Sequence, residues 1–249
     1  MFTKISRISY FCQTEQKGFY IFMDIHRLVF NRLDENTYIA SGAPGRCVVI
    51  DPGCQPGEEQ EKMLSRLRGL GLTPEAILLT HGHMDHTYGA AALQKEFGIP
   101  VYMSPEDKPV IDYFQRVGRF GIPVPDASFT TTDISDGSVI DAAGLSFKVI
   151  TTPGHSPGCV CYYDEARGVM FSGDTLFAGA IGRSDLFGGD YDQEIKAIME
   201  KLMILPGPTE IYPGHGPAST ISEERTGNPF LEPFNEREEI PELNQAQYD

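Results

Sequence analysis

Short apolar runs with strand character alternate along the chain with helical stretches, and glycine and proline separate them. Met63 and Leu67 recur at helical spacing, whereas residues 76–79 form a continuous apolar run, as in a buried strand. The first half is predicted to contain strands at 27–31, 36–41, 47–53, 76–80 and 101–104 and helices at 58–68, 85–97 and 105–118.

The second half repeats this alternation without repeating the sequence. It is predicted to contain strands at 138–141, 145–152, 159–164, 169–174 and 209–216 and a helix at 191–205. Two strand-rich halves, each with helices on one side, predict two packed sheets with helices outside them. The expected fold is therefore a four-layer αββα sandwich of the α+β class.

A single domain is expected, because no linker is long enough to separate two. Residues 23–249 are predicted to form this domain, which ends in a short acidic tail. Residues 1–22 are predicted to be an N-terminal extension that could be poorly ordered. Lys4 and Arg7 are followed by polar residues that interrupt the apolar run, which is unlike a signal peptide.

Net charge limits the classes of binding partner, and cysteine content bears on the cellular compartment. The net charge of −15 argues against nucleic acid and anionic membranes, because binding to phosphates depends on Lys and Arg. No apolar run approaches the roughly 20 residues needed to span a bilayer. Five cysteines, an odd number in a chain of 249 residues, favour reduced thiols and a cytoplasmic location.

Three histidines and an aspartate crowd the segment H-G-H-M-D-H at 81–86, directly after the predicted strand at 76–80. In an extended segment residues two apart point the same way, so His81 and His83 can converge on one ion. A helix that begins near Asp85 then directs Asp85 and His86 toward a second point nearby. A run of unrelated histidines is the alternative, and the density of the motif disfavours it.

Three more candidates also follow predicted strands: His155, Asp174 and His215. A rigid scaffold commonly presents its site on loops at strand ends. Imidazole and carboxylate without thiolate suit zinc, with iron or manganese as alternatives, in a catalytic site better than in a closed structural one. Seven ligands exceed the needs of one tetrahedral ion, so two divalent metal ions are expected.

The motifs H-G-H-M-D-H at 81–86, G-H at 154–155, G-D at 173–174 and G-H at 214–215 occur in this order. In order and spacing they resemble the metallo-β-lactamase superfamily, from about residue 23 to 215. The resemblance implies the αββα fold and a dinuclear centre. It implies that His81, His83 and His155 hold the first metal, that Asp85, His86 and His215 hold the second, and that Asp174 bridges both.

Within the superfamily, the segment S-G-D-T-L-F-A-G-A-I-G-R-S-D at 172–185 resembles glyoxalase II (hydroxyacylglutathione hydrolase), particularly its short bacterial members. That resemblance implies hydrolysis of thioesters such as S-lactoylglutathione. Asp174, in place of the Cys typical of the main zinc β-lactamases, points the same way. Arg183 and Asp185 match the G-R-[ST]-D element of the group, and we favour a loop-locking pair over direct catalysis.

Full-length glyoxalase II carries a C-terminal helical domain that supplies glutathione contacts. Here 34 residues follow His215, and they are too acidic to replace a basic domain. The expected substrate is therefore a small-molecule thioester or ester whose thiol carrier stays open. The oligomeric state stays open as well.

The expected mechanism uses a hydroxide held between the two ions, because paired cations lower the pKa of a shared water toward 7. This hydroxide would attack the thioester carbonyl while a metal stabilises the oxyanion. Asp85 would bind the second ion and accept the remaining proton. A thiolate leaves without a dedicated acid.

Other activities remain open on the same residues. A mononuclear iron dioxygenase of the persulfide type would use two His and one Asp as a facial triad, and metal stoichiometry would distinguish it. Lactonase, phosphodiesterase or other small-ester activity also occurs on this fold, whereas a non-enzymatic metal-stabilised module is disfavoured. Net charge weakens an RNA-processing role.

Several further side chains have simpler interpretations. Cys54, Cys159 and Cys161 are predicted to be packing thiols. One of Tyr113, Phe114 and Phe120 could line the substrate site, although core contacts are favoured for all three. His26 is expected to be a partly exposed strand residue.

Overall fold

The computed structural model describes residues 7–13, 20–117 and 124–234. A seven-stranded sheet contains the first half of the chain, with its strands in sequence order. The first four strands pair antiparallel and the last four are parallel. The strands are β1 (Arg7–Gln13), β2 (Tyr20–Phe30), β3 (Glu35–Ala43), β4 (Arg46–Ile50), β5 (Thr73–Leu78), β6 (Val101–Met103) and β7 (Thr131–Asp133).

A six-stranded sheet contains the second half, in the order β15-β14-β11-β10-β9-β8. Its neighbours are antiparallel except β11 and β14, which are parallel. The strands are β8 (Val139–Ala142), β9 (Leu145–Thr151), β10 (Val160–Asp164), β11 (Val169–Gly173), β14 (Glu210–Pro213) and β15 (Ser219–Thr220). A small hairpin of β12 (Leu176–Phe177) and β13 (Ala180–Ile181) follows β11.

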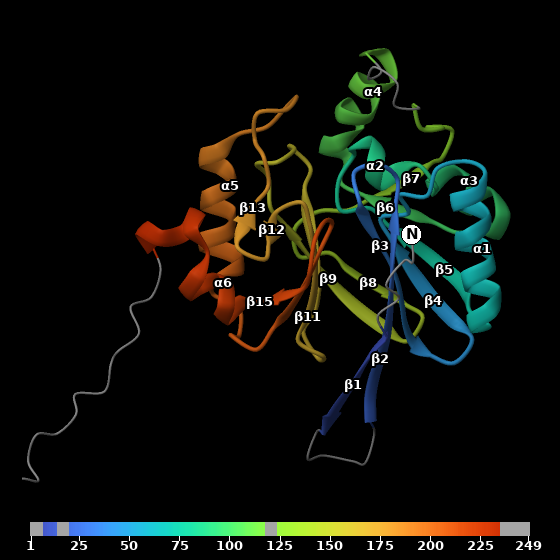
Figure 1. Ribbon diagram of the computed structural model, residues 1–249, viewed down its shortest axis with the longest axis horizontal. Helices are drawn as coiled ribbons and strands as arrows, with labels where there is room; N and C mark the ends of the chain where they lie inside the picture. Colours follow the sequence, from blue (N-terminus) through green and yellow to red (C-terminus); the bar gives the residue numbers. More distant parts are fainter. Residues whose placement is uncertain (1–6, 14–19, 118–123, 235–249) are drawn as a thin grey trace, which may run out of the picture.

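Helices cover the outer face of each sheet, which confirms the αββα sandwich (Figure 1). On the first sheet they are α1 (Glu58–Leu70) and α3 (Ala90–Phe97). The short helix α2 (Met84–Thr87) and helix α4 (Lys108–Val117), which follows a 3-10 turn at Pro105–Asp107, lie at the upper end of the sandwich in the view of Figure 1. On the second sheet the helices are α5 (Tyr191–Ala197), a π-helical turn at Ile198–Leu202, α6 (Ile221–Gly227) and a 3-10 helix at Pro229–Phe234. None of the helices in the described ranges is long and apolar enough to cross a membrane.

The helix predicted over 85–97 is divided into α2 and α3. The backbone N–H of Gly89 donates to the carbonyl of Pro52 at 2.7 Å. A side chain at residue 89 would also press on the sulfur of Cys54. This contact with the loop after β4 interrupts the helix, and no local sequence signal announces it.

The predicted N-terminal extension overlaps the first sheet. Strand β1 lies within residues 1–22 and pairs antiparallel with β2, which begins at Tyr20. The domain boundary at residue 23 stays a prediction. Residues 1–6 and 14–19 of the extension, and the acidic tail from residue 235, lie outside the described residues.

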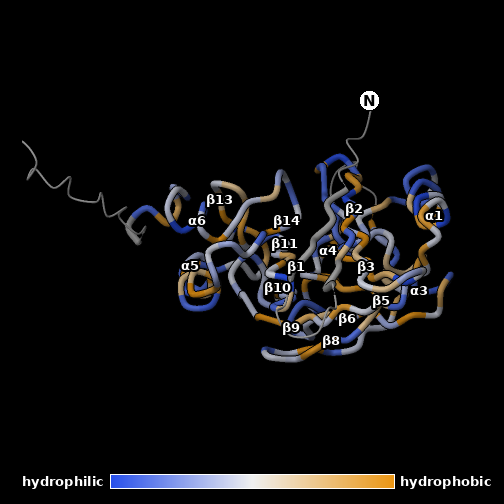
Figure 2. Tube along the Cα trace, turned by 90° about the horizontal axis from the view of Figure 1, so that it is seen from below, coloured by the Kyte–Doolittle hydropathy of each residue, from blue (hydrophilic) through white to orange (hydrophobic). Residues whose placement is uncertain are grey.

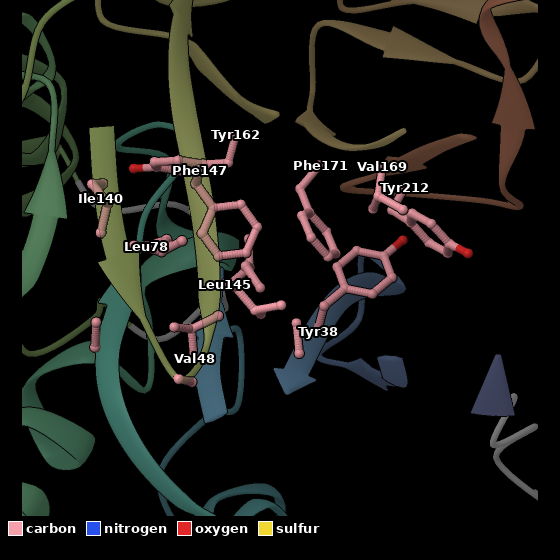
Figure 3. Close-up of a cluster of buried hydrophobic side chains, with 14 of the residues drawn as sticks. Tyr38, Val48, Leu78, Ile140, Leu145, Phe147, Tyr162, Val169, Phe171 and Tyr212 are labelled. Carbon is pink, nitrogen blue, oxygen red and sulfur yellow. The ribbon is translucent and has the colours of Figure 1, made fainter. Parts of the chain in front are cut away.

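The main core lies between the two sheets. Tyr38, Phe147 and Phe171 pack there with their ring centroids 5.2–6.1 Å apart (Figure 3). Strand β9 alternates buried and exposed residues over most of its length, whereas β10 and β11 are buried throughout because layers cover both of their faces. Hydrophobic positions accordingly follow the inner strands, and hydrophilic ones gather toward the outer turns of α1 and α5 (Figure 2).

The two sheets are also joined by hydrogen bonds at the end of β5. The hydroxyl of Tyr162 donates to the carbonyl of Leu79 at 2.8 Å, and the N–H of Val160 donates to the carbonyl of Thr80 at 2.9 Å. Tyr162 is fully buried. These bonds fix the strand end that leads directly into His81.

Tyr162→Phe should therefore destabilise the fold, because it deprives the buried Leu79 carbonyl of its short bond. We expect a loss of about 1–3 kcal/mol in the free energy of unfolding, seen in a denaturant titration. Tyr163→Phe is the matched control, because the Tyr163 hydroxyl makes no hydrogen bond to any described residue. Equal losses in the two variants would contradict this role of Tyr162.

Candidate metal centre

The seven candidate ligands all lie at one edge of the two sheets, directly after strands or in the short helix α2. His81 and His83 follow β5, and α2 carries Asp85 and His86. The second sheet contributes the remaining three: His155 from the loop between β9 and β10, Asp174 after β11 and His215 after β14. Because β11 and β14 are parallel, their carboxyl ends bring Asp174 and His215 together.

Two groups of three side chains form within this set. His81, His83 and His155 each place a ring nitrogen within 4.8 Å of the other two, and we call them the first triad. Asp85, His86 and His215 meet the same criterion and form the second triad. The resemblance assigned one metal to each of these groups, and that assignment stays a prediction.

Asp174 lies between the triads. Its Oδ1 is 3.4 Å from Nε2 of His86, and its Oδ2 is 3.5 Å from Nε2 of both His155 and His215. One carboxylate therefore reaches both groups, as a bridging ligand must.

The donor atoms fit a bound cation. The Nε2 atom of His81 and the Oδ1 atom of Asp174 are buried and lack a hydrogen-bond partner among the described residues. Nδ1 of His83 lies 2.8 Å from Nε2 of His155, so two ring nitrogens of the first triad face each other. Buried polar atoms without a partner are costly, and a cation could use the lone pairs of these nitrogens and of the carboxylate oxygen.

Burial lowers the pKa values of two histidines of the first triad. Burial lowers the pKa of His83 to about 3 and that of His81 well below its usual range. Both rings are therefore neutral, the form that binds metal. Burial opposes ionisation of Asp174, but the imidazoles of His86 and His155 outweigh it and hold the pKa of this carboxyl well below its usual value.

His86 behaves differently because carboxylates surround it. Burial alone would lower its pKa, but Asp174 and Asp85 raise it well above the usual value. A cation among these carboxylates would take the place of the proton on Nε2, which faces Asp174.

Each of four histidines has its Nδ1 beside an oxygen, which directs Nε2 toward the centre. The partners are Thr80 Oγ1 for His81 at 3.0 Å, Asp51 Oδ2 for His86 at 3.0 Å, the Arg183 carbonyl for His155 at 2.8 Å and the Leu33 carbonyl for His215 at 2.9 Å. Asp51 also accepts the N–H of Thr80 at 2.7 Å. Asp51 was missed in the sequence, although the D-P-G motif after a strand was the available signal.

Asp107 is a second residue that sequence reasoning missed. It is fully buried; its Oδ2 accepts from the N–H of Gly82 at 2.6 Å and the hydroxyl of Ser156 at 2.7 Å, and its Oδ1 accepts from the N–H of Gly158 at 2.6 Å. It therefore ties the loop of His81 and His83 to the loop of His155. A side chain at residue 82 would meet Asp107, so glycine is required there.

Two buried glutamates lie against the centre without full hydrogen bonding. Glu35 has one oxygen bonded to Thr37 at 2.9 Å, and its Oε1 has no partner among the described residues. Both carboxyl oxygens of Glu194 also lack such a partner. Glu194 packs against Gly154, and its Oε1 leaves no room for a side chain at Gly182. No sequence pattern marked either glutamate.

The residues with simpler interpretations can now be placed. Arg183 and Asp185 form a two-bond ion pair at 2.7 and 2.8 Å on the exposed loop after β13, the geometry of a loop-locking pair.

His26 is 3% exposed, so the expectation of a partly exposed residue was wrong. Arg66 covers it from α1, with the nearest nitrogens 3.1 Å apart. Cys54, Cys159 and Cys161 are buried thiols, as predicted.

A cavity of about 460 Å³ opens over both triads. Phe114 is 5% exposed, in line with the favoured core contacts, and it also lines this cavity. Tyr113 instead stacks on Phe187, and Phe120 lies outside the described residues. The lining residues are Leu33, His83, Met84, Asp85, Tyr88, Phe114, His155, Asp174, Phe177, Ala180, Ile181, Arg183, Leu186 and His215.

Comparisons with known proteins identify a family and a fold. A family model described as "Metallo-beta-lactamase superfamily" matches residues 31–215. A curated relative, "Hydroxyacylglutathione hydrolase GloC" of Haemophilus influenzae, is 34% identical over 84% of this chain and 98% of its own length.

Two solved structures share the fold across most of the chain. "BLEG-1 B3 metallo-beta-lactamase" has a TM-score of 0.74 at 35% identity and covers 83% of this chain and 99% of its own. "TTHA1623 in a di-iron-bound form" has a TM-score of 0.71 at 38% identity and covers 82% and 99%. The second of these proteins was solved in a di-iron-bound form.

Glu194 should make stability depend on pH. Burial raises the pKa of its carboxyl from 4.5 to about 8. Between these values the folded chain holds a proton that the unfolded chain has lost, so the free energy of unfolding falls as pH rises from about 4.5 to about 8. Glu194→Gln removes this dependence, and its stability relative to the wild type should increase by at least about 1 kcal/mol across the window.

Denaturant titrations at pH 5, 7 and 9 would measure that difference. Glu200→Gln, at an exposed position of the same helical segment, is the matched control and should show no such trend. A Glu194→Gln effect that is constant with pH would refute the raised pKa.

Proposed function

The chain belongs to the metallo-beta-lactamase superfamily, and on this basis we propose that it is a hydrolase that uses two divalent metal ions to cleave a thioester or a related small ester. The observation that carries the proposal is the convergence of seven imidazole and carboxylate side chains, among which His81 and Asp174 each have a buried donor atom without a partner. The first triad would hold one ion, the second triad the other, and Asp174 would bridge them.

When bound, the ion pair would supply a water of lowered pKa and polarise the carbonyl of the substrate. The protein's own residues provide the rest. Asp85 has a side chain that is 13% exposed and lines the cavity, with Oδ2 3.3 Å from Nε2 of His215. Oδ2 is thus placed to accept the proton of the attacking water.

The backbone of Asp85 is held by a hydrogen bond from a neighbouring side chain. The amide of Asn31 donates to the carbonyl of Asp85 at 3.1 Å and to the carbonyl of Gly53 at 3.2 Å. These bonds fix the backbone that carries Asp85, so that its carboxylate faces the cavity in a single position. No dedicated acid is needed for a thiolate leaving group.

Two lines of support favour a thioester within the hydrolase class. The relative from H. influenzae is named for hydrolysis of a glutathione thioester and aligns over nearly its whole length. Position 174 is an aspartate, as in the glyoxalase II group. Zinc suits the nitrogen and oxygen donors, and the di-iron neighbour makes iron the main competitor.

We also propose a cytoplasmic location. Cys47, Cys54, Cys159 and Cys161 are buried free thiols. Unpaired thiols are the usual state of cysteine in a reducing compartment.

Metal analysis combined with a hydrolysis panel tests this proposal. We expect two metal equivalents per chain, thioester hydrolysis that is lost with a chelator, and its recovery when metal is returned. A single iron with oxygen consumption would instead indicate a mononuclear dioxygenase. Turnover of only a lactone or a β-lactam would retain the hydrolase class and reject the thioester.

Asp174→Ala should uncouple the two ions, because it removes the carboxylate that reaches both triads. We expect fewer than two metal equivalents per chain and a fall in kcat/KM of at least about 100-fold. Asp141→Ala, at an exposed position on β8, is the control and should retain both metals. A fully loaded and fully active Asp174→Ala protein would contradict the bridging role.

A further inference from the structure

The walls of the cavity above the two triads are mostly apolar. Apart from the candidate ligands and Arg183, its lining is made of Leu33, Met84, Tyr88, Phe114, Phe177, Ala180, Ile181 and Leu186. A pocket of this kind gains binding energy from apolar substrate surface and orients the substrate through a few polar groups. Here those polar groups are the ones assigned to metal.

Aromatic rings flank both triads. The ring of Phe114 meets His83 of the first triad edge to face, with centroids 5.3 Å apart. The ring of Phe177 lies 6.4 Å from that of His215 of the second triad. The two portions of a substrate that extend from the scissile carbonyl would therefore both meet apolar surface.

A stacked aromatic pair extends the apolar wall outward. Tyr113 on α4 and Phe187 after β13 are parallel within 5°, with centroids 4.2 Å apart. Each is the sequence neighbour of a lining residue, Phe114 and Leu186 respectively. The pair joins the two sides of the cavity.

Arg183 is the one cationic side chain among the described residues that line the cavity. Its Nε and a terminal nitrogen donate to both carboxyl oxygens of Asp185 at 2.7 and 2.8 Å. Two of its five N–H donors are therefore used, and the charge of Asp185 offsets that of the guanidinium. A substrate carboxylate that approached the remaining donors would also meet the negative charge of Asp185.

From these observations we propose that the substrate is a thioester with an apolar acyl group and a thiol portion without carboxylates. The inference rests on the proposed function and specifies its substrate. The carboxylates of a glutathione thioester would find one cationic side chain among the described lining residues, Arg183, whose charge Asp185 already offsets. A thioester with an uncharged thiol would leave no charge unpaired.

Matched thioesters test the charge of the thiol portion. S-lactoylglutathione and its diethyl ester differ in the two carboxylates alone, and S-lactoyl-N-acetylcysteamine carries the same acyl group on a smaller, uncharged thiol. We expect kcat/KM for the last two to exceed that for S-lactoylglutathione by about tenfold or more, because an unpaired like charge is costly at a binding surface. Lengthening the acyl chain on N-acetylcysteamine from butanoyl to pentanoyl and hexanoyl should raise kcat/KM about threefold per methylene.

A gain of specificity provides an independent test. Leu33 lines the cavity and is 50% exposed, so a longer polar side chain can be placed there. Leu33→Lys supplies the missing cation and should raise kcat/KM for S-lactoylglutathione relative to its diethyl ester. Leu33→Gln, of similar length but uncharged, should not raise that ratio.

The outcomes separate the two levels of the proposal. Equal or faster turnover of S-lactoylglutathione, compared with the carboxylate-free thioesters, would overturn the inference and leave a thioester hydrolase. Failure of the metal-loaded protein to hydrolyse any thioester would overturn the proposed function, and the inference with it.

Discussion

Fixing one ring nitrogen of a histidine so that the other points inward is the constraint on which the metal centre depends. Four of the five candidate histidines have Nδ1 beside an oxygen, and these oxygens belong to Thr80, Asp51, Arg183 and Leu33. They come from four separate segments of the chain. The orientation of the centre is therefore a property of the whole sandwich and not of the H-G-H-M-D-H segment alone.

Strand direction brings those segments to one place. β4, β5 and β6 are parallel, so Asp51, His81 and Asp107 emerge at the same edge of the first sheet. The bonds from Tyr162 and Val160 then hold the second sheet to the end of β5. Rigid connections of this kind keep donor atoms in place even though the arrangement leaves some of them without partners.

The sequence was sufficient for the layered fold and for picking out the seven side chains that the structure brings together, because both produce local signals. Strand and helix periodicity is visible within a few residues, and histidines after apolar runs are conspicuous. The remaining features depend on partners that are distant along the chain. Asp107 lies in a stretch with helical character and shows its role only where Gly82 and Gly158 donate to it. Glu194 looks like an ordinary helix residue until Gly154 and Gly182 enclose it.

The two triads do not each belong to one sheet. The first takes His81 and His83 from one half of the molecule and His155 from the other, and the second takes Asp85 and His86 from one half and His215 from the other. Any cation held there would bind side chains from both halves and so hold the two halves together. By mass action it would favour the folded chain in proportion to the logarithm of the free metal concentration. The lifetime of this protein in a cell would then follow the local supply of metal.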